Sequence, residues 1–494
     1  MESSYLWNLT ASGLAFLLPA GFLLVAASGM SAQRAWDAAL GGMAAFCLAG
    51  LGYWAAGFAF QFGSVGFLYS DHPDLSGLLR GWSPLPEGWG VGWIAAGLDG
   101  WFLNGPAATP GAMGLFLAHA PWSMTAALLP VLALRGRAPA LATLIVALVV
   151  GAVVYPLAGN WVQGGGWLAA LGSNAGLGHG LVDFGGGGTV FLVSASASMA
   201  ALLVWPPGRR ARPQSANSEL PTVHLPLLAV VGSLFVMAGV LAWVWAGPIQ
   251  QPGTNAYTAM RTAVNGLLYA TGGVTVPLLY TWFVTGTSDP GMSARGLVAG
   301  VIAGLAAGPF PGHAGALLTG LLAGGSVPFA THALRRVFRL DDGAGIFATA
   351  GIPAAIGLVS VSIFADGAAG AGWQQVGAGS YLGVTGQGVT GLLAAPGFQS
   401  NFLGQFQAQM IGIVGLGLWG FVSGSIICVP LGLFFYGFGR AVQSDEYVRH
   451  QEAARASQQH WSEGTNVVRG EASFSQEMAA RPPSEMPAEE PRFQ

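Results

Sequence analysis

The chain contains a series of apolar runs, each close to the length of about 20 residues that a helix needs to cross a lipid bilayer. We expect eleven such spans, at residues 6–28, 37–62, 112–133, 138–159, 186–206, 225–249, 259–285, 293–308, 313–334, 345–365 and 404–437. Only 8% of the 494 residues are charged, whereas a soluble protein carries about 25%. The sequence therefore predicts an all-α polytopic membrane protein with eleven transmembrane helices.

The distribution of arginine predicts how these spans are oriented. All 18 cationic residues are arginines, because the sequence contains no lysine. Most lie in or beside one alternate set of loops: Arg34, Arg135, Arg137, Arg209, Arg210, Arg212, Arg295, Arg335, Arg336 and Arg339. The other set has Arg80, with Arg261 near a helix end. By the positive-inside rule the arginine-rich loops are cytoplasmic. This predicts a multi-pass protein of the plasma or inner membrane, with the N-terminus outside and the C-terminus in the cytoplasm.

The apolar runs and the polar stretches between them divide the chain into regions. Residues 1–440 form the predicted membrane domain, in which 1–206 and 225–365 are two halves and 404–437 is a final long helix. Segments 63–111 and 367–403 would lie outside the cell. Residues 441–494 are polar and contain Glu, Gln, Ser and Pro. Such a composition buries too little apolar surface to fold, which predicts a disordered cytoplasmic tail.

Several classes of function are not supported by the residues. Cys47 and Cys428 both lie in apolar runs, where cysteine is more typical as a small core residue than as a disulfide partner. The chain has no phosphate-binding loop, nucleophile elbow or metal-ligand spacing, and it is not basic enough for nucleic acid. We therefore expect no enzyme activity, no cofactor, no metal and no nucleic-acid partner.

Two stretches share an unusual pattern. Residues 183–192 read DFGGGGTVFL and residues 341–351 read DDGAGIFATAG, so each has an acid, then glycines, then the start of an apolar helix. Their positions before the fifth and tenth spans indicate two inverted five-helix halves, an arrangement that places sites near the middle of the membrane. Glycine before a transmembrane helix also occurs simply because helices pack closely, so the pattern alone does not establish a site.

These half-sites and several shorter stretches together resemble the ammonium transporter (Amt/Rh) family. The resemblance covers roughly residues 5–440, and its other matches are GYWAAGF at 52–58, FG at 62–63, DGWFL at 99–103, YPLA at 155–158, GGGWL at 164–168 and RVFRLDD at 336–342. It implies a homotrimer of eleven-helix protomers in the lipid bilayer, each with its own narrow pore. A cytoplasmic or membrane partner protein is a further possibility, and Asp183 matches the family's buried aspartate.

The resemblance also implies the parts of the pore. The family has an outer vestibule that recruits ammonium, a gate of two stacked phenylalanines and a pair of facing histidines. In this chain the vestibule positions fall at Trp161 (or Val162), Asp183 and Gly247, the gate-region positions at Ala120 and Leu241, and the histidine positions at Leu192 and Ala350. Leucine and alanine cannot share a proton as paired imidazoles do.

Because of these departures, Asp183 and His119 each have two possible roles. The whole protein also has two possible functions. Asp183 either caps the fifth span, because helix N-termini stabilise carboxylates, or contacts a cation. His119, in the third span, is either a substitute polar group of the pore or a histidine hydrogen-bonded between helices. An apolar pore strongly disfavours ions and favours a neutral solute such as ammonia. The protein is therefore expected to be a divergent ammonium channel or transporter, or alternatively a non-transporting sensor or structural subunit.

Overall fold

The structure of the protein is a computed structural model that describes residues 2–28, 32–86, 91–135, 137–205, 224–248, 254–338, 340, 342 and 344–438. The chain divides into a main unit, Met1–Pro430, and a second unit that begins at Leu431. The main unit contains the elements discussed below. The predicted tail at 441–494 lies outside the described residues, as do Arg209, Arg210, Arg212, Arg339 and Asp341.

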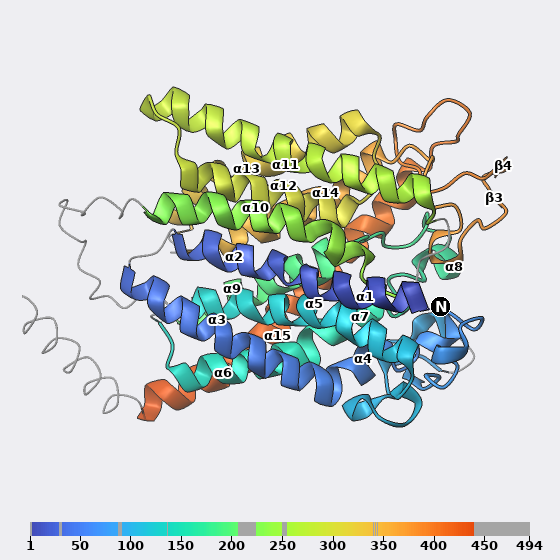
Figure 1. Ribbon diagram of the computed structural model, residues 1–494, viewed down its shortest axis with the longest axis horizontal. Coiled ribbons are helices and arrows are strands. Elements are labelled where there is room, and N and C mark those ends of the chain that lie inside the picture. The colour runs from blue at the N-terminus through green and yellow to red at the C-terminus, as the bar shows by residue number, and fades with distance from the viewer. Residues whose placement is uncertain are drawn as a thin grey trace, which may run out of the picture. The chain divides into compact units, whose positions relative to one another are not determined.

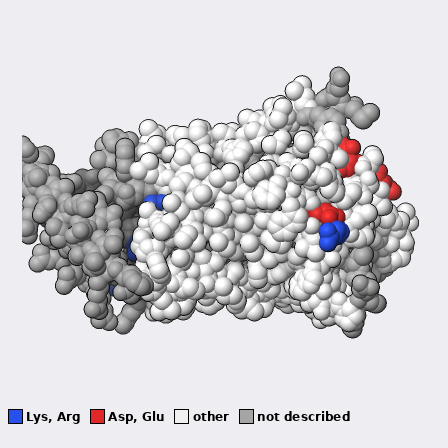
Figure 2. Space-filling view, turned by 90° about the horizontal axis from the view of Figure 1, so that it is seen from below, with Lys and Arg blue, Asp and Glu red and all other residues white. Residues whose placement is uncertain are grey.

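Eleven helical segments of the described chain are long and apolar enough to cross a membrane, which confirms the predicted fold class. They are built from α1 (Glu2–Ala15) with α2 (Leu17–Ser28), α3 (Ala32–Gly52) with α4 (Phe58–Phe62), α5 (Pro110–Leu134), α6 (Ala140–Val149) with α7 (Tyr155–Val162), α9 (Val193–Val204), α10 (His224–Trp245), α11 (Ala256–Thr285), α12 (Pro290–Ala307), α13 (His313–Arg336), α14 (Ile352–Phe364) and α15 (Phe402–Phe438). Figure 1 shows these helices side by side. On the face drawn in Figure 2, the broad stretch between the two ends shows no charged side chain among the described residues, as a lipid-facing surface requires.

Short elements gather at the end of the bundle where the N-terminus lies (Figure 1). These are the helix α8 (Leu171–Ala175) and two antiparallel pairs, β1 (Gly81–Trp82) with β2 (Ala96–Gly97) and β3 (Ser380–Tyr381) with β4 (Val384–Thr385). The Asp99 carboxylate accepts hydrogen bonds from the backbone N–H groups of Leu79 and Arg80. The described residues of the segment at 63–111 thus form an ordered cover with few regular elements.

Four membrane spans contain a π-helical turn. The turns are Tyr53–Gly57 between α3 and α4, Val150–Val154 between α6 and α7, Gly187–Leu192 before α9, and Phe347–Gly351 before α14. A π-turn holds one residue more than an α-turn and is frequent at functional sites. The first two turns contact each other, and so do the last two. The last two belong to the two acid-and-glycine stretches.

Helices α11, α12 and α13 approach one another through glycines. A Cβ atom at Gly324 of α13 would lie 1.9 Å from the carbonyl oxygen of Gly273 on α11, and one at Gly273 would lie 2.4 Å from the carbonyl oxygen of Gly296 on α12. Any side chain at these positions would have to displace a neighbouring backbone. Small residues at helix contacts are the main way in which membrane helices pack tightly, and here they hold three helices together.

An ion pair connects α11 to the segment that follows α14. The Arg261 guanidinium lies 2.6 Å from the Asp366 carboxylate and also donates to the carbonyl of Phe310 and the hydroxyl of Tyr257. Next to it, the side chain of Asn265 donates to the carbonyl of Pro311 and contacts His313. Arg261 is therefore buried and paired within the helix bundle.

A glycine pair in α11 and α13 offers a test of this packing. We expect Gly324→Ala to lower the thermal stability of the detergent-solubilised protein, because its Cβ would overlap the Gly273 backbone and overpacking costs about 1–3 kcal/mol. Gly266→Ala, where a Cβ meets nothing within 4 Å, is the matched control and should be neutral or slightly stabilising. Equal unfolding temperatures for both variants, measured by loss of the size-exclusion peak, would contradict the close contact.

Candidate functional site

Asp183 accepts hydrogen bonds from the start of the helix in the first half-site. Its carboxylate accepts hydrogen bonds from the backbone N–H groups of Gly188, at 3.0 Å, and Thr189, at 2.9 Å, and from the Thr189 hydroxyl, at 3.1 Å. Burial raises the pKa of the Asp183 carboxyl to about 6, and the hydrogen bonds from Gly188 and Thr189 act in the opposite direction. The carboxylate thus satisfies N–H groups at the start of a helix, which otherwise have no partner. Its geometry is that of a helix cap.

The second half-site repeats this arrangement. The Asp342 carboxylate accepts hydrogen bonds of 2.8 Å from the backbone N–H groups of Ile346 and Phe347. In both half-sites the acid comes before a π-helical turn, which then continues as α9 or α14. The two stretches that share a sequence pattern therefore also share a local structure.

A cavity with a volume of about 100 Å³ lies next to Asp183. A water molecule needs only about 10–15 Å³ of such space, so the cavity has room for several. Its lining residues come from the first half-site, the aromatic segments around it and the 373–374 turn: Phe62, Val65, Tyr69, Leu115, Ala118, His119, Trp122, Val162, Gln163, Asp183, Phe184, Trp243, Val244, Trp245, Gly247, Thr254, Trp373 and Gln374. We call it the vestibule cavity. Asp183, Gly247 and His119 all line it.

Of the two vestibule positions that the resemblance suggested at this point, Val162 lines the vestibule cavity, and the other is Trp161. It does not line the vestibule cavity; its indole N–H donates to the carbonyl of Ala95, and its ring packs against Trp167 and Trp419. Two residues later, Gln163 lines the cavity, and its amide N–H donates to the hydroxyl of Thr189 at 3.2 Å. Gln163 is thus connected through Thr189 to Asp183.

Two indoles are stacked at the wall of the vestibule cavity. The rings of Trp122, on α5, and Trp243, on α10, have centroids 5.2 Å apart and planes only 6° apart. Trp243 is held by a hydrogen bond from its indole N–H to the carbonyl of Gly185, at 2.9 Å. Gly186 has a left-handed backbone, with φ of 76°, and a Cβ there would lie 2.5 Å from the ring of Trp122. The glycine run therefore makes room for the stack.

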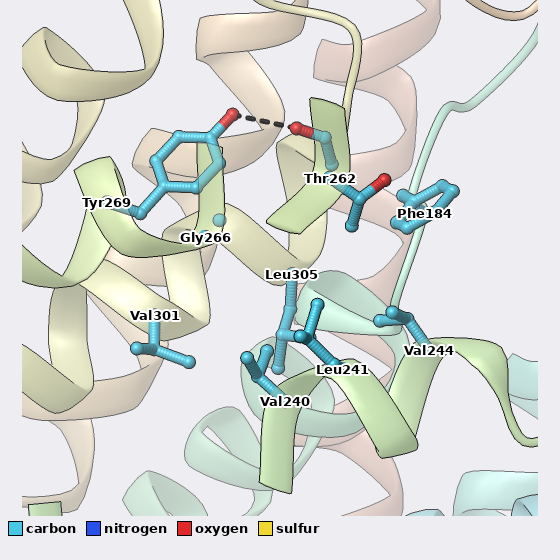
Figure 3. A pocket seen from close by; sticks show the side chains of 11 residues that line it. Phe184, Val240, Leu241, Val244, Thr262, Gly266, Tyr269, Val301 and Leu305 are labelled. Atoms are coloured by element: carbon cyan, nitrogen blue, oxygen red, sulfur yellow. Dashed lines mark hydrogen bonds between the residues drawn. The ribbon is translucent and has the colours of Figure 1, made fainter. Parts of the chain in front are cut away.

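The gate-region positions suggested by the resemblance lie two residues before these indoles. Ala120 is buried in α5 but does not line the vestibule cavity, whereas its neighbours His119 and Trp122 do. Leu241 is 41% exposed and lines a second, apolar cavity between α10, α11 and α12, together with Val240, Val244 and Leu305 (Figure 3). Trp122 and Trp243, which lie two residues after these positions, do line the vestibule cavity.

His119 belongs to a buried polar cluster at the cavity. Its Nδ1 atom lies 3.4 Å from the amide nitrogen of Gln61 and 3.3 Å from the hydroxyl of Tyr155. Gln61 in turn donates to Tyr155 and accepts a hydrogen bond from Tyr53. The imidazole ring packs against Phe62 and against Trp122 of the stack, with centroids 4.8 Å and 4.6 Å apart. One ring nitrogen is thus occupied by the cluster, while the residue itself faces the cavity.

Leu192 and Ala350 lie in the two π-helical turns, which contact each other. Both are buried, with exposures of 6% and 0%, and neither lines the vestibule cavity or the second cavity. Phe191, beside Leu192, packs against the ring of Trp243 at a centroid distance of 6.3 Å. The two positions at which the resemblance predicts the family's histidines are thus apolar and buried, and Phe191, beside one of them, contacts the indole stack.

Comparisons with known proteins identify the family of the chain. The model of the Ammonium Transporter Family matches residues 6–456. An ammonium transporter, Amt2, of Archaeoglobus fulgidus is 26% identical over 371 residues, which are 74% of this chain and 72% of the relative. A putative ammonium transporter of Synechocystis is 28% identical over 372 residues, 73% of this chain and 75% of the relative.

Solved structures with the same fold include two of particular interest. A protein described as Sensor Amt Protein has a TM-score of 0.66 and 20% identity, and the match covers 87% of this chain and 94% of the other. Mep2 of Candida albicans has a TM-score of 0.64 and 22% identity, with 87% and 84% covered. At these identities the likeness concerns the fold alone.

The capping geometry of Asp183 can be tested by substitution. Asp183→Ala leaves the N–H groups of Gly188 and Thr189 buried without an acceptor, and each such loss costs about 1–3 kcal/mol. We expect a clearly lower unfolding temperature in detergent, with Asp183→Asn intermediate because it keeps one acceptor oxygen.

Asp289→Ala is the matched control, since Asp289 caps α12 through one hydrogen bond to Gly291 in an exposed position. It should have a smaller effect, about 0.5–2 kcal/mol. If Asp183→Ala were as stable as the unchanged protein, Asp183 would not be a structural cap.

Proposed function

Because the chain belongs to the ammonium transporter family, we propose that it is a membrane transporter that takes up ammonium at the vestibule cavity and passes neutral ammonia. The main observation in support of this proposal is that a polar cavity, a pair of stacked indoles and two apolar residues occur together in the site. A polar cavity is lined by Asp183, Gln163 and His119, the stacked indoles of Trp122 and Trp243 lie at its wall, and Leu192 and Ala350 replace the family's histidines.

The energy of desolvation favours the neutral form. An ion in a low-dielectric slot faces a cost of tens of kcal/mol by idealised estimates, and less after relaxation. Paired histidines would offer polar groups and exchange a proton near neutral pH, but Leu192 and Ala350 do neither. Ammonia carries no charge and so avoids most of this cost. Ammonium must then lose its proton before it passes the indole stack.

His119 is the proposed proton acceptor in the vestibule cavity. The oxygens of Asp183 already accept three hydrogen bonds within the protein, so Asp183 orders the site rather than taking the proton. In the tautomer whose Nδ1–H donates to the hydroxyl of Tyr155, Nε2 carries no hydrogen and can accept a proton from a molecule in the cavity. An N–H bond of ammonium breaks, its proton moves to the imidazole, and the proton then returns to the solution on the side of the vestibule.

The assembly and orientation are part of the same proposal. The protein is a multi-pass membrane protein, and we place it in the plasma or inner membrane with its N-terminus outside and its C-terminus in the cytoplasm. It would form a homotrimer, with one pore in each protomer. The many exposed apolar side chains of α11, among them Met260, Leu267 and Phe283, support burial of this helix by lipid or by a neighbouring protomer.

A second candidate is a non-transporting sensor or a structural subunit of a membrane complex. One observation favours it: the apolar residues Leu192 and Ala350 at the positions where the resemblance predicts the paired histidines. The family consists of transporters, which are not enzymes, so we propose no catalytic activity for either role. Gentle purification that yields a stoichiometric partner, combined with flux no greater than in empty liposomes, would favour this alternative.

Transport of neutral ammonia has a specific signature in proteoliposomes. An inward ammonium gradient should raise the internal pH faster than in empty liposomes, because each entering ammonia molecule binds a proton inside. The rate should not depend on an imposed membrane potential, and no current should accompany it. A flux equal to that of empty liposomes would exclude transport, whereas a current that follows the membrane potential would exclude the neutral species.

The indole stack provides a second test. We expect removal of both rings, in the double variant Trp122→Ala and Trp243→Ala, to raise ammonia permeability about tenfold, equivalent to ~1.4 kcal/mol of barrier. Trp161→Ala is the control, because Trp161 is an indole of the same region that does not line the vestibule cavity. A folded double variant with an unchanged rate would show that the stack is not the barrier.

A further inference from the structure

Four residues that line the vestibule cavity each carry a buried polar side-chain atom that has no hydrogen-bond partner. Among the described residues, the indole nitrogens of Trp122 and Trp373 and the amide oxygens of Gln163 and Gln374 have no hydrogen bond. All four residues line this one cavity. Two of the atoms are N–H donors and two are oxygen acceptors. Buried polar atoms nearly always have a partner, so four exceptions around one cavity point to a molecule that binds there.

The unpaired atoms are held in place by other contacts of the same side chains. Gln163 uses its amide N–H to bind Thr189, and Gln374 uses its own to bind the carbonyl of Val162 at 3.4 Å. These bonds leave the oxygen of each amide free. Trp122 is stacked on Trp243, and Trp373 packs against Phe184 and Phe310. The donors and acceptors therefore belong to side chains that are already positioned.

The backbone that carries Trp373 and Gln374 is strained. Gln374 and Gln375 have left-handed backbones, with φ of 50° and 63°, directly after Gly372 and Trp373. Residues other than glycine rarely adopt this conformation, and such strain concentrates where proteins bind ligands. The strained turn brings both a donor and an acceptor to the vestibule cavity, which is an indication of binding independent of the unpaired atoms.

Ammonium alone does not complement this set of atoms. It has only N–H donors, so it can bind the oxygens of Gln163 and Gln374 but cannot accept from the indoles of Trp122 and Trp373. A complementary molecule needs an oxygen acceptor as well as N–H donors. It needs no charge, because the four unpaired atoms belong to neutral indole and amide groups, and it must be small enough for a cavity of about 100 Å³.

We propose that the vestibule cavity binds a small neutral amide of the formamide, acetamide or urea class, whose carbonyl accepts from the indoles and whose N–H groups donate to the glutamines. This inference rests on the proposed function, because it assigns a second class of solute to the cavity through which ammonium would enter. Binding of the amide blocks the cavity and slows ammonium flux.

Isothermal titration of the purified full-length protein with formamide, acetamide and urea tests the proposal. At least one of these amides should bind once per protomer. Trp122→Phe keeps an aromatic ring for the stack but removes the N–H, and Gln374→Leu removes the free oxygen. Each should weaken binding about tenfold, the usual effect of one lost hydrogen bond. Trp161→Phe removes an N–H that is already paired outside the cavity, and it should leave binding unchanged.

Two outcomes would overturn the inference. If none of the three amides binds to a protein that is folded by size exclusion, water alone fills the cavity. If Trp161→Phe weakens binding as much as Trp122→Phe, the effect does not come from the cavity.

Ammonium flux, measured separately without amide, distinguishes this inference from the proposed function. Amide binding without ammonium flux supports the inference and excludes transport of ammonium. Ammonium flux that none of the amides slows supports transport and excludes amide binding in the vestibule cavity.

Discussion

The hydrogen bonds that Asp183 accepts from Gly188 and Thr189 are the interaction on which the rest of the site depends. Backbone N–H groups inside a membrane protein need partners within the protein, because lipid offers none. Asp183 supplies them at the start of the π-helical turn Gly187–Leu192. This permits the glycine run to enter the bundle in an irregular conformation. The same run gives Trp122 room at Gly186 and gives Trp243 its acceptor at Gly185.

The departures from the family's pore form a consistent set. The resemblance predicts that Leu192 and Ala350 stand in place of the imidazoles; the indoles of Trp122 and Trp243 are stacked at the vestibule cavity, and a glutamine, Gln163, lies on its wall. Apolar residues disfavour an ion beyond the stack, and amide and indole groups favour hydrogen-bonding solutes in front of it. Selection would thus occur at the vestibule cavity, before the stack, through hydrogen bonds to solutes that are neutral or become neutral there.

The fold could be predicted well from the sequence because the length and the apolar character of a stretch of residues are enough to predict a membrane span. The predicted span 186–206 corresponds to Gly187–Val204, and the predicted span 313–334 corresponds to His313–Arg336. The site could be predicted less well. The sequence suggested Trp161 or Val162 for the vestibule, and Val162 lines the vestibule cavity. Near the suggested gate positions Ala120 and Leu241, the residues that line this cavity are Trp122 and Trp243. A step of two residues on a helix is a rotation of about 200°, so the sequence alone does not decide which of two such residues faces the cavity.

The sequence by itself determined the class of protein, the number of spans and the two acid-and-glycine half-sites. These are local properties, since a run of apolar residues must cross the membrane as a helix and an acid before a helix caps it. Only the tertiary structure decided which faces of α5, α7 and α10 meet at the vestibule cavity. It also brought Trp373 and Gln374 to that cavity from a segment about 200 residues beyond Asp183 in the chain. Such long-range contacts depend on how helices rotate and pack against one another, and glycine contacts such as those around Gly273 set that packing.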